Sequence, residues 1–428
     1  MFFPIAFQVL FLALLATFGW AANLQLLSQA GIEVRPILQL SHPPAAHRDG
    51  ERVGDGLHQS IYRLAAILSG IAFTGWILCA FVSTPEAQTQ VTLLTYLSIV
   101  IVAVLPQRVV CHTVRMQFIK SLVRIVKPSL SDPVYLSDVI MADILTSCAR
   151  MLADMCLVAC QFGALQVDAI CSDPGIIGAI LVASPYVFRL RQCVNEYLRA
   201  PAGSSDAKRH FANAVKYASS LPVICLSATQ KRVAVDGLLE TKSSDWALRV
   251  VFGLWIAAVA FNSLYSFYWD IAFDWDLGHR PDGWKLSYLI APATASKTHT
   301  ASSSSSSSVD GPGESGIALE LEQAEKTSET HVLFPADAFN EAPHSTGTSL
   351  CPLHWMLRPR LCFSPHTIYY FAMVTDFLLR VTWAMKLSSH IQIDVMAYGG
   401  FWLNVFEIYR RWQWTFLRIE KEAASEQP

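Results

Sequence analysis

Apolar residues recur along this chain in blocks that are long enough to cross a lipid bilayer. About 20 apolar residues span the hydrocarbon core as one helix, and short polar segments separate the blocks. The pattern predicts an all-α polytopic membrane bundle of about nine or ten helices. The nine blocks are Ile5–Leu27, Ile61–Val82, Val91–Leu105, Val139–Leu165, Pro174–Phe188, Phe211–Ala228, Trp246–Ala272, His366–Leu387 and Ile391–Phe416.

The segment between Pro106 and Pro128 alternates basic and apolar residues, so it does not fit the same pattern. Arg115, Lys120 and Arg124 are interleaved there with large apolar side chains. Two interpretations stay open, a tilted span that lines a polar cavity and an amphipathic helix that lies in the membrane interface.

One long segment breaks the apolar pattern. Residues 291–354 contain a serine run followed by an acidic stretch. Such a composition cannot bury enough apolar surface to offset the entropy of ordering, which predicts a disordered cytosolic insert, either a passive linker or a phosphorylated regulatory loop. The expected organisation is 1–130 for the N-terminal membrane helices, 131–290 for the first part of the core, 291–354 for the insert, 355–422 for the last two helices and 423–428 for a tail.

Composition and charge support a membrane protein. Of the 428 residues, 53% are hydrophobic and 15% are charged, whereas soluble domains usually carry about 25% charge. The formal net charge of -2 gives no indication of nucleic-acid binding. The ten cysteines follow no metal-ligand or disulfide spacing, and those in apolar runs, such as Cys160, are expected to be small core residues.

The distribution of basic residues predicts the orientation. Basic residues follow Phe188 and also flank the last apolar block, and such residues concentrate in cytosolic loops. The first block lacks the basic flank and cleavage site of a signal peptide, so we interpret it as an uncleaved span. Counting the nine blocks together with the Pro106–Pro128 segment as a further span predicts that both termini are cytosolic.

Several charged residues lie inside the apolar blocks, where each costs roughly 2.5–3.5 kcal/mol on insertion scales. Each group has a structural interpretation as an ion pair, such as Asp376 with Arg380 or Glu407 with Arg411. Their number favours a charged path through the bundle. The groups are Asp143 with Thr146, Asp270 with Asp274, Arg380 with Trp383, and Glu407 with Arg410 and Arg411.

The residue types suggest what such a path carries. Arginine suits the oxygens of phosphate and carboxylate because its planar fork donates two hydrogen bonds. Arginines on separate helices therefore favour an oxyanion with two or three charges, and nearby carboxylates would keep the binding releasable. We expect Asp270 and Asp274 to meet cations from another helix, with Arg410 or Arg411 favoured. The same residues are also compatible with a proton-coupled cation transporter.

Six stretches in order resemble the EXS domain of eukaryotic phosphate exporters, over roughly Pro106 to Glu422. "NSLYSFYWDIAFDWDLG" is similar to its signature, and "PYVFRLRQCVNEYL", "HFANAVKYASSLPVI" and "FEIYRRWQWTFLRIEKE" are similar to other parts. The start directly in a membrane span resembles the short fungal branch, which lacks the domain that senses inositol pyrophosphates. Thr146 stands where exporters often have asparagine. The resemblance implies a phosphate pathway that includes Asp143, Thr146, Arg189, Lys216, Tyr217, Asp270, Asp274, Arg380, Trp383, Glu407, Arg410 and Arg411.

The resemblance also implies a location and partners. It points to a multi-pass Golgi membrane protein that returns inorganic phosphate from the lumen to the cytosol and supports glycosylation and protein retention. The expected partners are phosphate, membrane lipid, Golgi glycosyltransferases and sorting proteins, and a homodimer stays open; no enzyme activity, cofactor or metal is expected. The alternative is a scaffold that sorts Golgi glycosyltransferases and ER lumenal proteins without transport.

Overall fold

A computed structural model describes residues 4–39, 56–105, 111–127, 133–163, 175–237, 244–279, 285–290, 356–387 and 399–426. Every regular element in these ranges is a helix, which confirms the all-α prediction. The expected insert at 291–354 lies outside them. The helices are α1 (Ile5–Gln29), α2 (Val34–Ile37), α3 (Leu57–Phe81), α4 (Pro85–Val104), α5 (His112–Val126), α6 (Leu136–Ser147), α7 (Ala149–Gln161), α9 (Gly175–Arg199), α10 (Ser205–Ala218), α11 (Ser220–Gly237), α12 (Ser244–Trp269), a π-helix η1 (Asp270–Asp274), a 3-10 helix η2 (Leu286–Leu289), α13 (Thr367–Leu387) and α14 (Gly399–Glu426).

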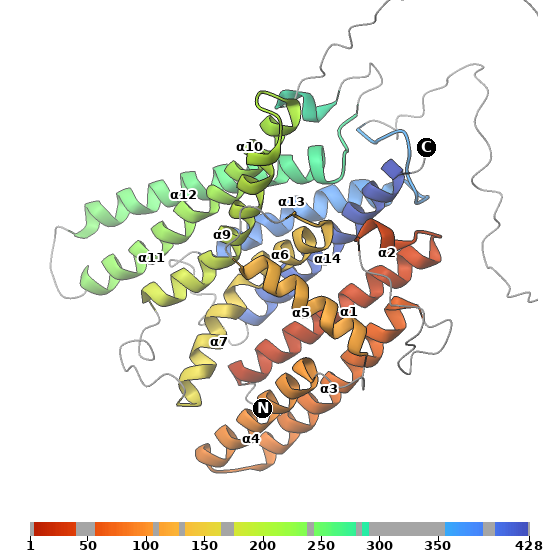
Figure 1. Cartoon of the computed structure of the whole chain (residues 1–428). Helices are drawn as coiled ribbons and strands as arrows, with labels where there is room; N and C mark the ends of the chain where they lie inside the picture. The colour runs from red at the N-terminus through yellow and green to blue at the C-terminus, as the bar shows by residue number, and fades with distance from the viewer. Residues whose placement is uncertain are drawn as a thin grey trace, which may run out of the picture. The chain divides into compact units, whose positions relative to one another are not determined.

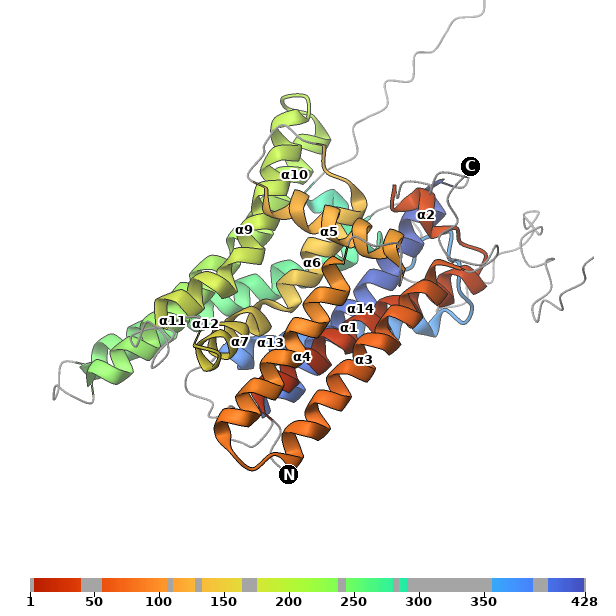
Figure 2. The same cartoon turned by 60° about the horizontal axis from the view of Figure 1, so that its bottom comes forward.

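Within the described ranges, five helices are long and apolar enough to cross a membrane: Ile5–Gln29, Leu57–Phe81, Pro85–Val104, Ile176–Arg199 and Leu248–Asp274. Their outer faces expose large apolar side chains, such as those of Phe81, Leu94 and Leu254. Exposed apolar surface of this kind is stable in lipid. The more polar helices α6, α13 and α14 lie between the group α1, α3 and α4 and the group α9, α11 and α12 (Figures 1 and 2).

Helix α5 is too short to be a span. Its 15 residues extend about 22 Å, against a hydrocarbon core of about 30 Å. Buried Arg115 donates to the carbonyls of Val102 and Leu105 at 2.8 and 2.7 Å and so caps the end of α4. Arg124 pairs with Asp138 of α6 at 2.6 Å. Of the two interpretations of this segment, length therefore favours the amphipathic connector.

Helices α1 and α14 run side by side in the same direction. Val9 of α1 and Ile408 of α14 belong to one buried hydrophobic cluster, and further along both helices the Asn23 amide donates to the Trp412 carbonyl at 2.9 Å. The start of α1 and the end of α14 therefore lie at opposite ends of the bundle (Figures 1 and 2). If both helices cross the membrane, these two ends face opposite sides of it. Two cytosolic termini would require α5 to cross as well, which its length disfavours, and they stay a prediction.

The end of α7 carries a cysteine whose role was predicted incorrectly. Cys160 forms a disulfide, with a partner outside the described ranges, and is not a simple core thiol. The other cysteines that the structure describes, including Cys156 and Cys193, are free. Protein disulfides persist mainly in oxidising compartments.

The segment after α12 is fastened to α14 by buried contacts. The Trp275 ring nitrogen donates to the Trp414 carbonyl at 3.3 Å, and Arg358 donates to the Trp275 carbonyl at 2.7 Å. Arg358 also pairs with Glu420, whose side chain is fully buried. These contacts hold η1, and the carboxylates on it, in a fixed position beside α14.

Candidate functional site

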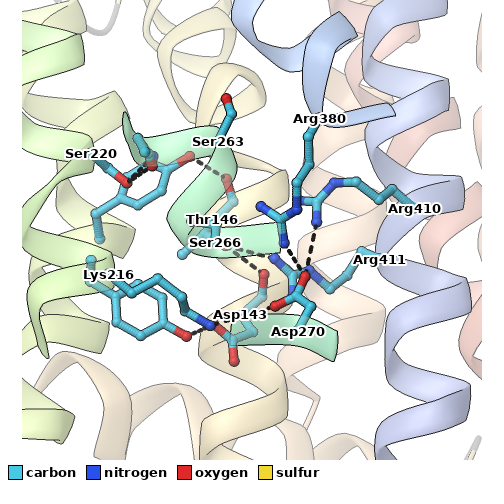
Figure 3. A pocket seen from close by; sticks show the side chains of 13 residues that line it. Asp143, Thr146, Lys216, Ser220, Ser263, Ser266, Asp270, Arg380, Arg410 and Arg411 are labelled. Carbon is cyan, nitrogen blue, oxygen red and sulfur yellow. Dashed lines mark hydrogen bonds and ion pairs between the residues drawn. The ribbon is translucent and has the colours of Figure 1, made fainter. Parts of the chain in front are cut away.

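A small cavity of about 50 Å³ lies where eight elements meet in the middle of the bundle (Figure 3). A site needs roughly 10–15 Å³ to hold one water, so the cavity can hold a few waters or a small anion. Most of the side chains around it are charged or carry hydroxyl groups. They are Asp143 and Thr146 of α6, Tyr186 of α9, Lys216 and Tyr217 of α10, Ser220 of α11, Asn262, Ser263 and Ser266 of α12, Asp270 of η1, Arg380 of α13, and Arg410 and Arg411 of α14.

One wall of the cavity is a closed network on α6, α9 and α10. Arg189 Nε lies 3.0 Å from Asp143 Oδ1, and both side chains are at most 3% exposed. The Tyr217 hydroxyl donates to the same carboxylate oxygen at 2.6 Å and accepts from Arg189 at 3.0 Å. Gln192 accepts a further hydrogen bond from Arg189 at 2.6 Å. Because every charge in this wall is paired, it is rigid and electrically balanced.

The opposite wall is built around the carboxylate of Asp270. Arg380 of α13 bonds it directly, while Lys216 Nζ lies 3.7 Å and Arg410 Nη1 lies 4.0 Å from it. Arg380 also bonds Asp376 at 2.9 Å. The predicted pairing of Asp376 with Arg380 is therefore confirmed, and Arg380 bridges two helices.

Two further carboxylates, which do not line the cavity, pair with the cations of this wall. Glu407 bonds Arg410 at 3.1 Å, three residues on, and not Arg411 as the i, i+4 interpretation expected. Asp376 lies 3.5 Å from the same Arg410. The guanidinium of Arg410 is thus oriented toward the cavity by carboxylates on α13 and α14.

Asp270 and Asp274 lie at the two ends of a short stretch in which the helix type changes. The Trp275 amide donates to the Asp270 carbonyl, five residues earlier, at 2.9 Å, which makes η1 a π turn. Such turns are rare and often occur at functional sites. Asp274 lies 3.4 Å from Lys216 and accepts from the Trp414 ring nitrogen at 3.2 Å. Its other cation is Arg418 at 3.8 Å, so the predicted pairing of Asp274 with Arg410 or Arg411 is wrong.

Arg411 differs from the other cations of the cavity. Its guanidinium donates to the Ser147 and Thr146 hydroxyls at 3.0 and 3.2 Å and lies over the Trp414 ring at 4.6 Å. It forms no ion pair with any residue of the described ranges. Four cations and only two carboxylates line the cavity, and Arg411 supplies a charge that a bound anion can neutralise.

A second cavity of about 280 Å³ lies on the other side of the Asp143 network. Asp143 borders both cavities. The larger one is also lined by Leu136 at the start of α6 and by Glu422 near the end of α14, so it lies toward the end of the bundle opposite Cys160. The Asp143 network therefore separates a small inner cavity from a wider vestibule.

The structure brings together most of the predicted site residues. Eight of the twelve line the small cavity, and Arg189, Asp274 and Glu407 directly contact these eight. Trp383 lies on α13, but its side chain is outside the described residues. Sequence reasoning missed the polar wall of Ser220, Asn262, Ser263 and Ser266. The signal was available, because the last three are polar residues within an otherwise apolar span.

The sequence profile of the EXS family matches residues 3–424. The chain belongs to the EXS family. The match begins in α1, whereas the resemblance noted from the motifs began only at Pro106. The N-terminal helices are thus part of the family's shared region.

Relatives within the EXS family include short fungal proteins and longer proteins. Protein ERD1 homolog 1 of Schizosaccharomyces pombe is 24% identical over 436 residues, covering 99% of this chain and 91% of the relative. Protein ERD1 of Kluyveromyces lactis is 23% identical over 295 residues, 66% of this chain and 58% of the relative. Phosphate transporter PHO1 homolog 8 of Arabidopsis thaliana is 28% identical over 204 residues, 45% of this chain but 24% of that longer protein.

Proposed function

We propose that this protein conducts inorganic phosphate across the Golgi membrane, from the lumen to the cytosol. The observation that carries the proposal is the small cavity, which four cations and two carboxylates line in the middle of a membrane bundle. Arg411 forms no ion pair with any residue of the described ranges, and its charge is therefore available to an oxyanion. Arginines at such depth are costly unless a function retains them. The similarity to a protein named as a phosphate transporter supports the same substrate.

In this proposal Lys216, Arg380, Arg410 and Arg411 coordinate the anion, and Arg189 holds Asp143 in place. The carboxylates orient the cations and keep the binding releasable, which conduction requires. Tyr217 links Asp143 to Arg189 and thereby separates the cavity from the vestibule. No covalent chemistry is needed for this role.

The Golgi location and the direction of transport are supported by a disulfide and by the position of the vestibule. The Cys160 disulfide supports an oxidising compartment at the end of α7, and the vestibule lies toward the opposite end, where it would open to the cytosol. Glycosyl transfer in the Golgi lumen leaves nucleoside diphosphates, whose hydrolysis releases phosphate. Removal of this phosphate would support glycosylation and the retention of Golgi and ER proteins.

The alternative is a membrane scaffold that sorts glycosyltransferases and ER lumenal proteins without transport. It is favoured by the completeness of the ion pairs, since Asp143, Asp270 and Asp274 each meet a cation of the protein itself. Under this alternative the cluster is structural. The cation Arg411, which forms no ion pair in the described ranges, argues against it.

Purified protein in liposomes distinguishes the two functions. We expect uptake of radiolabelled phosphate that saturates and that falls at least tenfold in Arg411→Gln, since this variant removes the charge available to the anion. Arg63→Gln, in α3 and away from the cavity, is the matched control. Uptake no greater than that of empty liposomes would overturn the transporter function.

A further inference from the structure

Phosphate and sulfate are similar in size and charge, but they differ in one hydrogen. At neutral pH hydrogen phosphate keeps a P–OH group, whereas sulfate has only unprotonated oxygens. Arginine and lysine can donate hydrogen bonds but cannot accept them. A cavity built from these cations alone would therefore bind both anions. Selection for phosphate requires an acceptor that faces the anion.

Two carboxylates of the small cavity are candidates for that acceptor. The oxygens of Asp270 face cations, because Oδ2 meets Arg380 and Arg410 and Oδ1 lies 3.7 Å from Lys216. Asp143 is different. Its Oδ1 accepts from both Arg189 and Tyr217, whereas its Oδ2 has no donor among the residues that the structure describes.

The environment of Asp143 keeps this second oxygen available. The side chain is only 2% exposed, and it borders the cavity. The buried Arg189 at 3.0 Å favours the ionised carboxylate, which can only accept hydrogen bonds. On the same helix, one turn away, Thr146 accepts from Arg411. An anion bound to Arg411 therefore lies close to Asp143.

We propose that Asp143 Oδ2 selects protonated oxyanions by accepting a hydrogen bond from the P–OH group. The inference rests on the proposed phosphate transport and specifies its substrate class. Hydrogen phosphate and hydrogen arsenate satisfy the free oxygen. Sulfate brings an unprotonated oxygen against a carboxylate, which leaves the buried acceptor unpaired and adds charge repulsion.

Wild-type protein in liposomes tests the selection directly. Uptake is measured at one pH for phosphate, arsenate, sulfate and monofluorophosphate, the last of which has the charge and shape of hydrogen phosphate without its hydroxyl. We expect phosphate and arsenate to enter, and sulfate and monofluorophosphate to enter on the order of 100-fold more slowly, the usual penalty for an unpaired buried acceptor. Sulfate uptake equal to phosphate uptake would overturn the inference, whereas absence of any phosphate uptake would refute the proposed function instead.

The variant Asp143→Asn tests the residue. Arg189 can only donate, so the amide oxygen keeps the place of Oδ1 and the amide nitrogen presents hydrogens to the anion. We expect the ratio of sulfate to phosphate uptake to rise at least tenfold. Asp276→Asn is the matched control, since Asp276 lies outside both cavities and is 34% exposed, and its ratio should equal that of wild type. An unchanged ratio of sulfate to phosphate uptake in folded Asp143→Asn would contradict the assignment to Asp143. If this variant does not fold, the uptake of the four anions by wild-type protein tests the proposal.

Discussion

Removal of the Asp270 carboxylate should destabilise the protein measurably. Arg380 bonds this carboxylate, and Lys216 and Arg410 lie within 4.0 Å of it. Loss of one partner from a buried ion pair typically costs 3–5 kcal/mol, because a buried charge is left unpaired. We therefore expect Asp270→Ala to lower the free energy of unfolding.

The structure also indicates which end of that range applies. Each affected cation keeps a second carboxylate after the substitution: Arg380 keeps Asp376 at 2.9 Å, Arg410 keeps Glu407 at 3.1 Å and Lys216 keeps Asp274 at 3.4 Å. None of the three is left without a counter-charge. We expect a loss near the lower limit, about 3 kcal/mol.

Thermal unfolding of the purified protein in detergent measures this loss. A loss of this size should lower the midpoint on the order of 5 °C. Asp270→Asn keeps the volume of the side chain, so a similar decrease would assign the effect to charge. Asp276→Ala is the control, because this carboxylate is partly exposed and lies outside the cluster, and it should shift the midpoint by less than about 2 °C. A midpoint of Asp270→Ala equal to that of wild type would refute the reasoning that the paired cations depend on this carboxylate.

Three other outcomes are expected. Arg380→Lys should lower phosphate uptake severalfold at unchanged protein level, because lysine cannot bridge Asp270 and Asp376 with a planar fork; wild-type uptake would exclude a direct role in anion binding. Deletion of residues 296–345 should leave uptake and folding nearly unchanged, as measured by flux per folded protein. Gly75→Ala should lower the unfolding midpoint, because a Cβ there would lie 2.1 Å from the Thr95 hydroxyl oxygen, whereas Gly70→Ala on the same helix meets nothing within 4 Å and should not.

The sequence predicted well which residues form the site. It predicted less well which of these residues form ion pairs with one another. Charges inside apolar blocks are visible without a structure, and so the cluster around Asp143 and Asp270 was predicted. The partner of Asp274 was not, because an α-helical projection cannot anticipate a π turn. The sequence also did not predict that α1 and α14 run in the same direction. Relative direction follows from the number of spans between two helices, and this number depends on whether α5 crosses the membrane.

The number of residues in the π turn at the end of α12 determines which carboxylates line the two cavities. One extra residue in the turn lets Asp270 face the inner cavity while Asp274 borders the vestibule. A chain one residue shorter would close an ordinary α-helical turn and rotate everything beyond it by about 100°. Asp274 would then leave Lys216, and Trp275 would leave the Trp414 carbonyl. Within this short stretch, a substitution changes one side chain, whereas a single deletion would alter the site and the core together.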